Sequence, residues 1–473
     1  MPLILSGNVA TATADVAFSV DNSLRFNSAD SANLDLTDPV GNNYYANFTF
    51  SFWVKRCKLG SEQFIIQSSQ TSTKSFGGIS FGANDALYVQ LYDSTSVLQF
   101  SLITNRLFRD VSAWYHIMVA FDLADGTAAD RIKIYVNGTR ETSFATETMA
   151  GAGFGSAFFI DLTDPVYIGS GRNTSGSTVY SDFYLAQFLC VTADSGDTDG
   201  LNADAELIPT QVGEFNSDTP TVWQPIEIDT AVLGASLDMS DNLGTNGFFL
   251  DFKDSANLGN DVNGGTDWDE NNIAATDQAT DTPTNNFSTM NPLDKKTGGT
   301  YTFAEGNLEV QQDISRGTLS TFAVAAGKWY AEAKFISTSG SDCVIGVIGF
   351  SNTANEDPGI PATGYVYNQD GTKKNSDTDA SFGDSYTTGD IVGIALDLTN
   401  LKIYFAKNGT WQDSGDPTSG GTGTGAAYTI TAPASTPSGF YFFTHADELS
   451  TNKVTWNFGN PPYANSSSVA DGN

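Results

Sequence analysis

The sequence predicts an all-β protein of two β-sandwich domains in series, joined by an irregular acidic connector. Segments of four to eight residues rich in Val, Ile, Phe, Tyr and Trp recur between clusters of Gly, Asn, Asp and Ser, as at 48–54, 86–91 and 132–136, which is typical of strands separated by turns. No window of a dozen residues sustains apolar positions at the spacing of a helix face. An Asn-Gly turn within a matching frame occurs once in each half of the chain, and this repetition indicates two domains of one general architecture.

The two Asn-Gly turns, Asn137–Gly138 and Asn408–Gly409, each predict a β-hairpin. A two-residue hairpin loop needs positive φ at both central residues, and Asn-Gly supplies them at little steric cost. Similar segments stand upstream of both turns: Phe121–Leu123 and Trp114–Tyr115 in the first half, Leu396–Leu398 and Trp329–Tyr330 in the second. A common architecture explains this repetition, although a Trp-Tyr strand and an Asn-Gly turn also arise separately in any two β domains.

Length and charge limit the function classes. The chain has 473 residues, enough for two large β domains and a connector. It carries 22 Lys and Arg against 55 Asp and Glu, a formal net charge of −33. Sequence-independent binding to nucleic acid and attraction to anionic membranes both depend on Lys and Arg, so this composition argues against both partners. A hydrophobic content of 40% and an aromatic content of 12% are sufficient for packed cores.

The most acidic stretch lies between the two predicted sandwiches. Residues 215–300 contain 14 Asp and Glu against three Lys and are rich in Asn, Thr and Gly, which is typical of an irregular connector that docks only in part. Within it, Phe248–Phe252 is interpreted as a strand and Trp268 as an anchor. The predicted bounds are an N-terminal arm at 1–17, a first sandwich at 18–215, the connector at 216–300, a second sandwich at 301–465 and a tail at 466–473.

The cysteines and the chain start indicate no disulfide scaffold and no targeting segment. Cys57, Cys190 and Cys343 are widely spaced and too few for a scaffold of this size, so we expect them to be buried as small hydrophobic residues. Residues 1–7 are apolar but lack the basic start of a signal peptide, and no stretch approaches the ~18 apolar residues of a membrane span. We therefore expect a chain without membrane insertion.

Segments of each predicted sandwich resemble a known domain family. In the first, the order and spacing over residues 18–192 resemble a laminin-G-like, concanavalin-type jelly-roll domain, through Asn22–Asn27, Phe48–Arg56, Trp114–Ile117, Tyr135–Gly138 and Tyr167–Gly169. In the second, residues 301–460 resemble a SPRY domain, through Gly327–Glu332, Ile345–Val347, Gly364–Tyr365, Tyr386–Gly393 and Ile403–Gly409. In the SPRY family an aspartate after Gly and an Asn-Gly hairpin recur, and here Asp390 and Asn408–Gly409 stand at these places. The resemblances imply two concanavalin-like jelly rolls.

The pairing of these two modules, with the segments Arg106–Asp110 and Gly247–Ser255, resembles virion structural proteins of marine bacteriophages, often tail fibres or other appendages. This resemblance implies a protein on the virion exterior, assembled in the host cytoplasm. The implied partners are other virion subunits, copies of the same chain in a homo-oligomer, and a host-surface glycan or protein. Adhesion through exposed loops is the function we favour; the alternatives are a capsid or tail decoration or spacer subunit and a glycan depolymerase.

Catalytic patterns are absent from the sequence. Glycan hydrolases need two carboxylates facing each other across a sugar, which a strand supplies at i and i+2 or i+4. No Glu-x-Asp-x-Glu occurs, and Glu332, on an alternating strand segment, has no acidic partner two residues away. Serine chemistry needs a histidine base, and both His116 and His445 stand in strand-like segments where a packed histidine is expected. We therefore expect no catalytic residue and no enzymatic activity.

One acidic loop fits part of a calcium-binding pattern, since Ca²⁺ prefers carboxylate oxygens. Residues 195–206 place Asp197, Asp199 and Glu206 at positions 3, 5 and 12 of such a loop. Ser195 stands where an aspartate is expected, and no helices flank the loop. A solvated acidic loop is the simpler interpretation.

A repeated hexapeptide gives a second arrangement for a cation. Asp-Leu-Thr-Asp-Pro-Val occurs at 35–40 and at 161–166. If the two turns meet in the jelly roll, their acidic residues would form a Ca²⁺ site: Asp35, Asp38, Asp161 and Asp164. The simpler interpretation is two Asp-Pro turns that end strands. No other cofactor is expected.

Binding of a glycan or a protein surface needs exposed aromatic residues with polar groups beside them. The candidates are Tyr44, Tyr45 and Tyr180 in the first sandwich and Tyr365, Tyr367 and Trp411 in the second. Most tyrosines of β-sandwiches are half-buried strand residues, which is the alternative role for each. The SPRY resemblance implies docking on loops at one end of the sandwich, with residues 365–370 at its rim.

Overall fold

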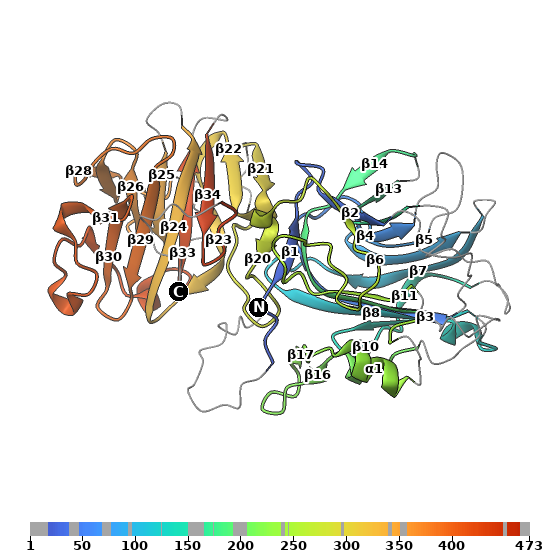
Figure 1. The fold of residues 1–473 in the computed structure, drawn as a ribbon. Helices are drawn as coiled ribbons and strands as arrows, with labels where there is room; N and C mark the ends of the chain where they lie inside the picture. The colour runs from blue at the N-terminus through green and yellow to red at the C-terminus, as the bar shows by residue number, and fades with distance from the viewer. Residues whose placement is uncertain are drawn as a thin grey trace. The chain divides into compact units, whose positions relative to one another are not determined.

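The chain forms two β-sandwich units (Figure 1). The computed structural model describes residues 18–36, 47–68, 77–92, 97–123, 125–149, 165–173, 175–192, 206–237, 242–244, 246–294, 298–338, 343–350, 357–447 and 452–463. One unit ends at Asn286 and the other begins at Phe287. The prediction of an all-β fold with two sandwiches in series is confirmed.

The described residues of the first unit form two eight-stranded sheets around one apolar core. The first sheet contains, in spatial order, β10 (Thr139–Arg140), β9 (Ile132–Val136), β8 (Trp114–Asp122), β3 (Asn47–Arg56), β15 (Phe183–Thr192), β1 (Ser23–Phe26) and β20 (Gln278–Ala279), and β18 (Phe248–Leu250) also pairs with β15. The second contains β11 (Phe144–Thr148), β7 (Leu98–Leu107), β6 (Ala86–Tyr92), β5 (Gly77–Phe81), β4 (Gln63–Ser68), β12 (Val166–Ile168), β2 (Asn33–Leu36) and β19 (Asp269–Asn271).

Smaller elements complete the described part of this unit. Two ribbons pair β13 (Ser170–Arg172) with β14 (Thr178–Tyr180) and β16 (Glu214–Phe215) with β17 (Trp223–Gln224). The helices are α1 (Thr230–Ser236) and the 3-10 turns η1 (Ala128–Asp130), η3 (Pro209–Gln211) and η4 (Ala275–Asp277). The Asp229 carboxylate starts α1 by accepting hydrogen bonds from the amides of Ala231 and Val232.

Strand β3 shows that other residues must cover both faces of the first sheet. Its alternate residues Phe48, Phe50, Phe52 and Val54 point into the core between the sheets. The opposite face carries Asn47, Thr49, Ser51, Trp53 and Lys55, of which Trp53 packs in a second apolar cluster. All ten residues of β3 are buried.

The described residues between 206 and 286 provide that cover, so most of the stretch expected to be a connector packs into the first unit (Figure 1, green to yellow). Leu207 and Leu233 pack against the outer face of β8 and β15, on which Phe249 of β18 also lies. Strands β18, β19 and β20 extend the two sheets. A bulge in β15 at Gln187, whose φ is 45°, lets its first half pair with β1 and its second half with β18.

The described residues of the second unit form an eight-stranded and a six-stranded sheet around a second core. The larger contains β21 (Tyr301–Ala304), β22 (Glu309–Gln312), β34 (Lys453–Asn457), β24 (Lys328–Ser337), β29 (Ile391–Asp397), β30 (Lys402–Lys407) and β31 (Thr410–Trp411), with β32 (Tyr428–Thr429) also paired to β30. The smaller contains β23 (Ile314–Val324), β33 (Tyr441–Asp447), β25 (Val344–Ile348), β26 (Gly364–Asn368), β27 (Thr372–Asn375) and β28 (Thr378–Ser381). The 3-10 turns are η5 (Glu305–Asn307), η6 (Gln412–Ser414), η7 (Gly420–Thr422) and η8 (Pro433–Ser435).

Both predicted Asn-Gly hairpins are confirmed, as β9–β10 and β30–β31. The φ angles are 49° and 73° in the first turn and 48° and 78° in the second. In each, the asparagine also bonds the neighbouring strand: Asn137 Oδ1 accepts from the amide of His116 at 2.8 Å, and Asn408 Oδ1 accepts from the amide of Ile391 at 2.8 Å. In each unit the asparagine therefore fixes the hairpin to the strand beside it, β8 in the first unit and β29 in the second.

The Trp-Tyr pairs, in contrast, are not equivalent in the two units. Trp114–Tyr115 begins β8, which is itself the strand before the hairpin strand β9. Trp329–Tyr330 lies in β24, the neighbour of β29 on the side away from the hairpin. The repeated Trp-Tyr pair therefore does not mark equivalent strands in the two units.

Asp390, one of the two residues that mark the SPRY resemblance, supports the second hairpin. Asn408 Nδ2 donates to its Oδ1 at 2.7 Å, the amide of Thr387 donates to its Oδ2 at 2.9 Å, and Lys407 lies 3.2 Å away. Burial alone would raise the pKa of Asp390, but these partners outweigh it and hold the pKa below its usual range. The role of Asp390 is thus to hold the turn.

All three cysteines are buried, as expected from the sequence: Cys57, Cys190 and Cys343. Among the described residues, no helix combines the length and the apolar character needed to cross a membrane.

Both histidines are fully buried and accept a hydrogen bond from a tryptophan. Trp223 Nε1 donates to His116 Nδ1 and Trp456 Nε1 donates to His445 Nδ1, each at 3.1 Å. Ser51 Oγ lies 2.9 Å from the other ring nitrogen of His116. Burial lowers the pKa of each histidine to about 3, so both rings are neutral at physiological pH. The expectation that they are packed residues is confirmed.

We predict that replacing Asn408 with Ala lowers the free energy of unfolding of the second unit by about 1–3 kcal/mol, because the amide of Ile391 loses its acceptor. Asn137→Ala should have the same effect on the first unit only. Urea unfolding of the full chain, followed by hydrogen exchange of peptides from each unit, measures both effects. Unchanged stability of the second unit in Asn408→Ala would contradict the role assigned to this contact.

We predict that the two buried histidines make stability fall with acidification. The unfolded chain protonates histidine below about pH 6.5, whereas the folded chain keeps it neutral down to about pH 3. Between these values the free energy of unfolding should fall by up to about 1.4 kcal/mol per pH unit for each histidine. His445→Gln should flatten this dependence in the second unit and leave the first unit, which retains His116, as an internal control. The same slope in the variant and the natural chain would be evidence against this assignment.

Candidate ligand-binding surface

Among the aromatic residues proposed from the first sandwich, the structure describes only Tyr180. It lies at the end of β14, opposite Ser170 of β13, with its side chain half-buried. Tyr44 and Tyr45 lie outside the described residues. Tyr180 therefore remains a candidate ligand-binding residue with a partly exposed side chain.

The expectation that Tyr365 and Tyr367 project from an exposed rim is wrong. Both lie in strand β26, and because they are two residues apart they share the face that points into the second core. The Tyr365 hydroxyl lies 3.1 Å from Thr431 Oγ1, and the Tyr367 hydroxyl donates to the carbonyl of Asp384. These tyrosines are amphipathic core residues whose polar ends are satisfied internally.

Two of the residues proposed for calcium can be located, and each has a protein partner. Glu206 pairs with Lys133 of β9, and Asp35 of β2 accepts a hydrogen bond from Asn271 of β19. The other five lie outside the described residues: Asp38, Asp161, Asp164, Asp197 and Asp199. Within the described part of the chain, no group of three or more His, Cys, Asp or Glu is arranged to hold a metal ion.

Strand β24 places aromatic and polar side chains on the outer face of the larger sheet of the second unit. Its residues Ala331, Ala333 and Phe335 point into the core. Because strand side chains alternate, Tyr330 and Glu332 lie on the opposite face. Tyr330 is 39% exposed, whereas Glu332 is only 1% exposed.

Three aromatic rings meet on this outer face: Tyr330 of β24, Tyr404 of β30 and Trp411 of β31. The ring centroids of Tyr330 and Trp411 are 6.2 Å apart, and those of Tyr404 and Trp411 are 6.4 Å apart, both edge to face. Tyr404 is buried, and Trp411 is half-buried. We refer to these three residues as the aromatic face.

Glu332 holds the exposed tyrosine in position. The Tyr330 hydroxyl donates to Glu332 Oε1 at 2.8 Å, and Asn457 Nδ2 donates to Oε2 at 3.0 Å. Burial, together with the acceptor Glu332, raises the pKa of Tyr330 above its ordinary value, so the hydroxyl stays protonated and keeps donating. Gly393 of β29 leaves space for this arrangement, since a Cβ there would lie 2.6 Å from the Tyr330 hydroxyl oxygen.

The arrangement suits stacking against a planar or apolar ligand surface. Two partly exposed rings at fixed angles lose little conformational entropy on binding, because their side chains are already held in one geometry. The polar edges of Tyr330 and Trp411 can take hydrogen bonds from or give them to a hydroxylated ligand. The aromatic face is therefore a candidate surface for a carbohydrate.

The sequence predicts only one member of the aromatic face, Trp411. A usable signal for Tyr330 exists, because Tyr330, Glu332 and Lys334 alternate with small or apolar residues along a strand. Tyr404 gives no such signal, since it stands in the uninterrupted apolar run 403–406.

Two family models match the chain, one in each unit. Residues 27–188 match the model described as the Concanavalin A-like lectin/glucanases superfamily, and residues 328–432 match the SPRY domain. Both domain resemblances drawn from the sequence are thereby confirmed. No curated protein matches the chain.

Solved structures similar to this chain include SPRY domains and a pentraxin. The SPRY domain of human HERC1 has 14% identity, with 34% of this chain and 95% of that chain covered and a TM-score of 0.26. A human SPRY domain has 16% identity, coverage of 36% and 99%, and a TM-score of 0.25. The heptameric SAP-like pentraxin from Limulus polyphemus has 14% identity, coverage of 37% and 77%, and a TM-score of 0.27. On the evidence of the two family models, the chain carries a laminin-G-type, concanavalin A-like domain followed by a SPRY domain.

Proposed function

We propose that this chain is an adhesive protein on the exterior of a bacteriophage virion, a tail fibre or another appendage, that binds a host-surface glycan. The observation that carries the glycan proposal is the aromatic face, in which Tyr330 and Trp411 present partly exposed rings held by buried neighbours. Lectin-like and SPRY sandwiches are binding folds, which supports adhesion as the general activity.

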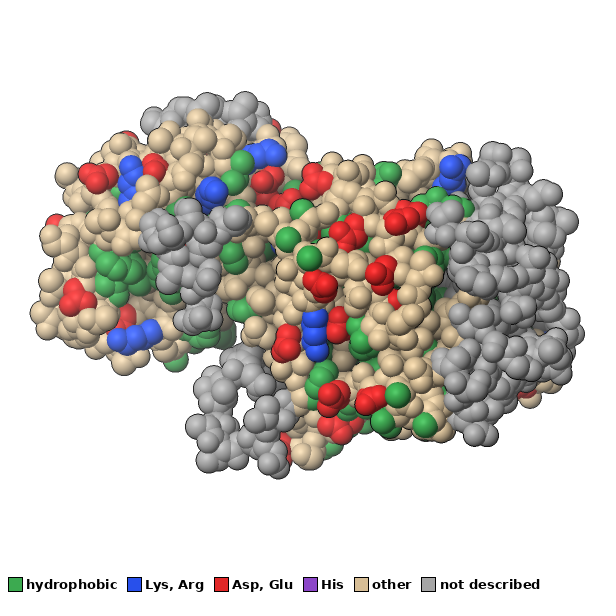
Figure 2. Space-filling model, viewed as in Figure 1, with side chains coloured by type: hydrophobic (Ala, Val, Ile, Leu, Met, Phe, Trp, Pro, Cys, Tyr) green, Lys and Arg blue, Asp and Glu red, His purple; other side chains and the backbone are tan. Residues whose placement is uncertain are grey.

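The distribution of charge favours an uncharged contact surface. Acidic side chains lie in small separate groups over the visible face of both units (Figure 2). With a formal net charge of −33 spread in this way, electrostatic steering would favour cationic partners only weakly and without a defined site. The charge serves solubility, and specific binding is left to neutral surfaces such as the aromatic face.

The proposed mechanism is adhesion by many weak contacts without catalysis. A single sheet face with two partly exposed rings binds a sugar weakly, so useful avidity requires several copies held together on one particle. We therefore propose a homo-oligomer attached to other virion subunits, with no nucleic acid or membrane partner.

We predict that Tyr330→Ala and Trp411→Ala each weaken glycan binding about tenfold or more, equivalent to about 1.4 kcal/mol. Tyr330→Phe, which keeps the ring and removes the hydroxyl, should retain most of the affinity. The measurement is surface plasmon resonance of the full chain on glycans identified with an array.

Phe440→Ala is the matched control for the aromatic face, because it removes a 43% exposed aromatic residue next to β33, in the other sheet of the same unit. It should bind within about twofold of the natural chain. Equal binding by the natural chain, Tyr330→Ala, Trp411→Ala and Phe440→Ala would exclude the aromatic face as the site. A natural chain that binds no glycan and no host cell, yet assembles on particles, would favour the spacer alternative.

The virion assignment is tested separately, by labelling intact particles with antibodies raised against the purified chain and imaging them by electron microscopy. Label on an exterior appendage is the expected result. Particles that contain the chain only in their interior, or not at all, would contradict the assignment.

A further inference from the structure

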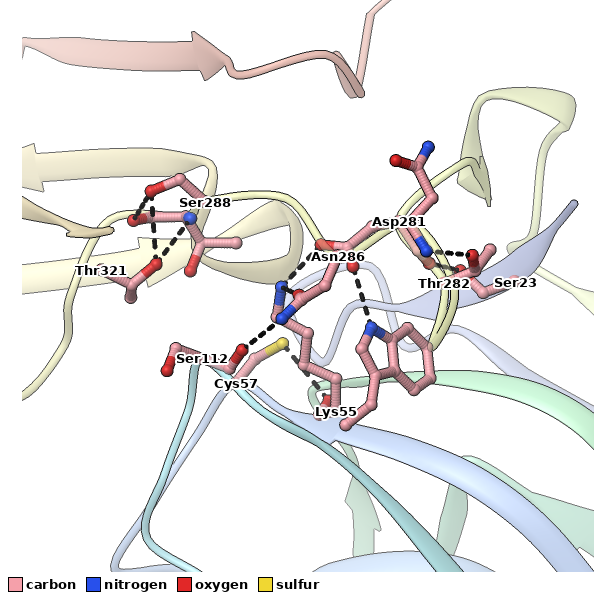
Figure 3. Close-up of polar contacts among 12 residues, drawn as sticks. Ser23, Lys55, Cys57, Ser112, Asp281, Thr282, Asn286, Ser288 and Thr321 are labelled. Carbon is pink, nitrogen blue, oxygen red and sulfur yellow. Dashed lines mark hydrogen bonds and ion pairs between the residues drawn. The ribbon is translucent and has the colours of Figure 1, made fainter. Parts of the chain in front are cut away.

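A buried polar cluster in the first unit brings a lysine, an aspartate and an asparagine into contact (Figure 3). Lys55 Nζ, on β3, lies 2.7 Å from Asp281 Oδ2 and 2.8 Å from Asn286 Oδ1. The lysine side chain is 0% exposed and that of the aspartate 2%. Lys55 and Asn286 are 231 residues apart in the sequence.

The two acceptors are held in place by further hydrogen bonds. Trp114 Nε1 donates to Asp281 Oδ1 at 2.9 Å, which leaves Oδ2 facing the lysine. Asn286 Nδ2 donates to the carbonyl of Ser112 at 2.7 Å, which fixes the amide with its oxygen toward Lys55 Nζ (Figure 3). Both acceptors are therefore oriented before any reaction.

The cluster is bordered by apolar residues on one side and is partly exposed at Asn286. It lies beside the core group that includes Trp53, Cys57, Trp114 and Tyr184, and Lys55 Nζ lies 5.8 Å from the centroid of the Tyr184 ring. Burying two opposite charges in such a site costs several kcal/mol per ion before their attraction is counted. Lys55 Nζ is placed to pass a proton to Asp281 Oδ2, 2.7 Å away, and this transfer would leave the amine as a nucleophile.

We propose that Lys55 and Asn286 become joined by an intramolecular isopeptide bond, with Asp281 carrying the protons. A neutral amine held within hydrogen-bonding distance of an amide oxygen is close to the carbonyl carbon, and such proximity can replace a large part of the activation barrier. The geometry supplies the three groups that the reaction needs: a nucleophile, an amide electrophile and an acid–base group that contacts the nucleophile.

The reaction balances without a co-reactant. Lys55 Nζ attacks Cγ of Asn286 while the Asp281 carboxyl group donates a proton toward Oδ1, and the new Nζ–Cγ bond forms a tetrahedral intermediate. Asp281 then accepts a proton from Nζ and passes it to Nδ2. The Cγ–Nδ2 bond breaks, one ammonia molecule leaves, and the proton on Oδ1 returns to Asp281 as the carbonyl re-forms. An amine and a primary amide thus become a secondary amide and ammonia, and nothing is oxidised or reduced.

The bond would tie the centre of the first sheet to the last residue of the unit. Asn286 ends the segment that covers the outer face of that sheet, and β3 is one of its central strands. A covalent link here would prevent the segment from peeling away from the sandwich.

The test is the intact mass of the full chain, purified and denatured under reducing conditions. The natural chain should be lighter than its sequence mass by one ammonia molecule. A tryptic digest should contain residues 26–56 joined to residues 254–295, because trypsin does not cleave after an acylated lysine. A mass equal to the sequence mass, with cleavage after Lys55, would overturn the proposal. This result comes from the natural chain and does not depend on the folding of any variant.

Variants then assign the roles. Lys55→Met, Asn286→Ala and Asp281→Asn should each show their full sequence mass. Lys58→Met is the matched control, because Lys58 is an exposed lysine three residues away whose ion pair with Asp182 lies at the surface; it should retain the loss of ammonia. Loss of ammonia in Lys55→Met or Asn286→Ala would assign the modification to other residues and overturn the proposal.

Discussion

Covering the outer face of the β8-β3-β15 sheet is the constraint on which the first unit depends. Met118, Leu189, Val191 and Phe249 make that face apolar, and Leu207 and Leu233 cover it. Each fully buried side chain of this size contributes about 1.5–3 kcal/mol relative to exposure. The cover is fastened at its end by Asp281, whose carboxylate bonds Lys55 and Trp114 and whose carbonyl accepts from Ser23. Removal of one partner from such a buried pair typically costs about 3–5 kcal/mol.

The sequence predicts the sandwiches well because strand and turn signals are local. Alternating apolar residues and the Asn137–Gly138 and Asn408–Gly409 turns specify strands and hairpins from a few neighbouring residues. The role of residues 206–286 depends instead on contacts across long separations. Leu207, Leu233 and Phe249 are spaced irregularly among acidic and polar residues, so no period of 2 or 3.6 reveals that they share a surface. Composition describes this segment correctly as acidic and irregular and says little about where it packs.

The sequence predicts the candidate surface only in part, for a related reason. A tyrosine in a strand is buried or exposed according to the face on which it lies, and a slip of one residue reverses the outcome. Tyr365 and Tyr367 lie on the core face of β26, whereas Tyr330 lies on the outer face of β24. The strands on either side of β24 hold the exposed ring in place. Gly393 of β29 leaves space for the Tyr330 ring, and Asn457 of β34 fixes the Glu332 carboxylate that holds it. Such pairings follow from strand order, which the sequence of one strand does not contain.

Hydrogen exchange of the full chain, followed by mass spectrometry, measures whether residues 206–286 are an integral part of the first unit. Amides of β18 and β20 pair with β15 and β1, so their exchange should be about as slow as that of β15 itself. Peptides that span 248–250 and 278–279 report on these strands. Slow exchange in both, at the level of β15, is the result that this structure predicts. Rapid exchange in either peptide while β15 stays protected would contradict it, because the segment would then be attached to the sandwich only as a loose connector.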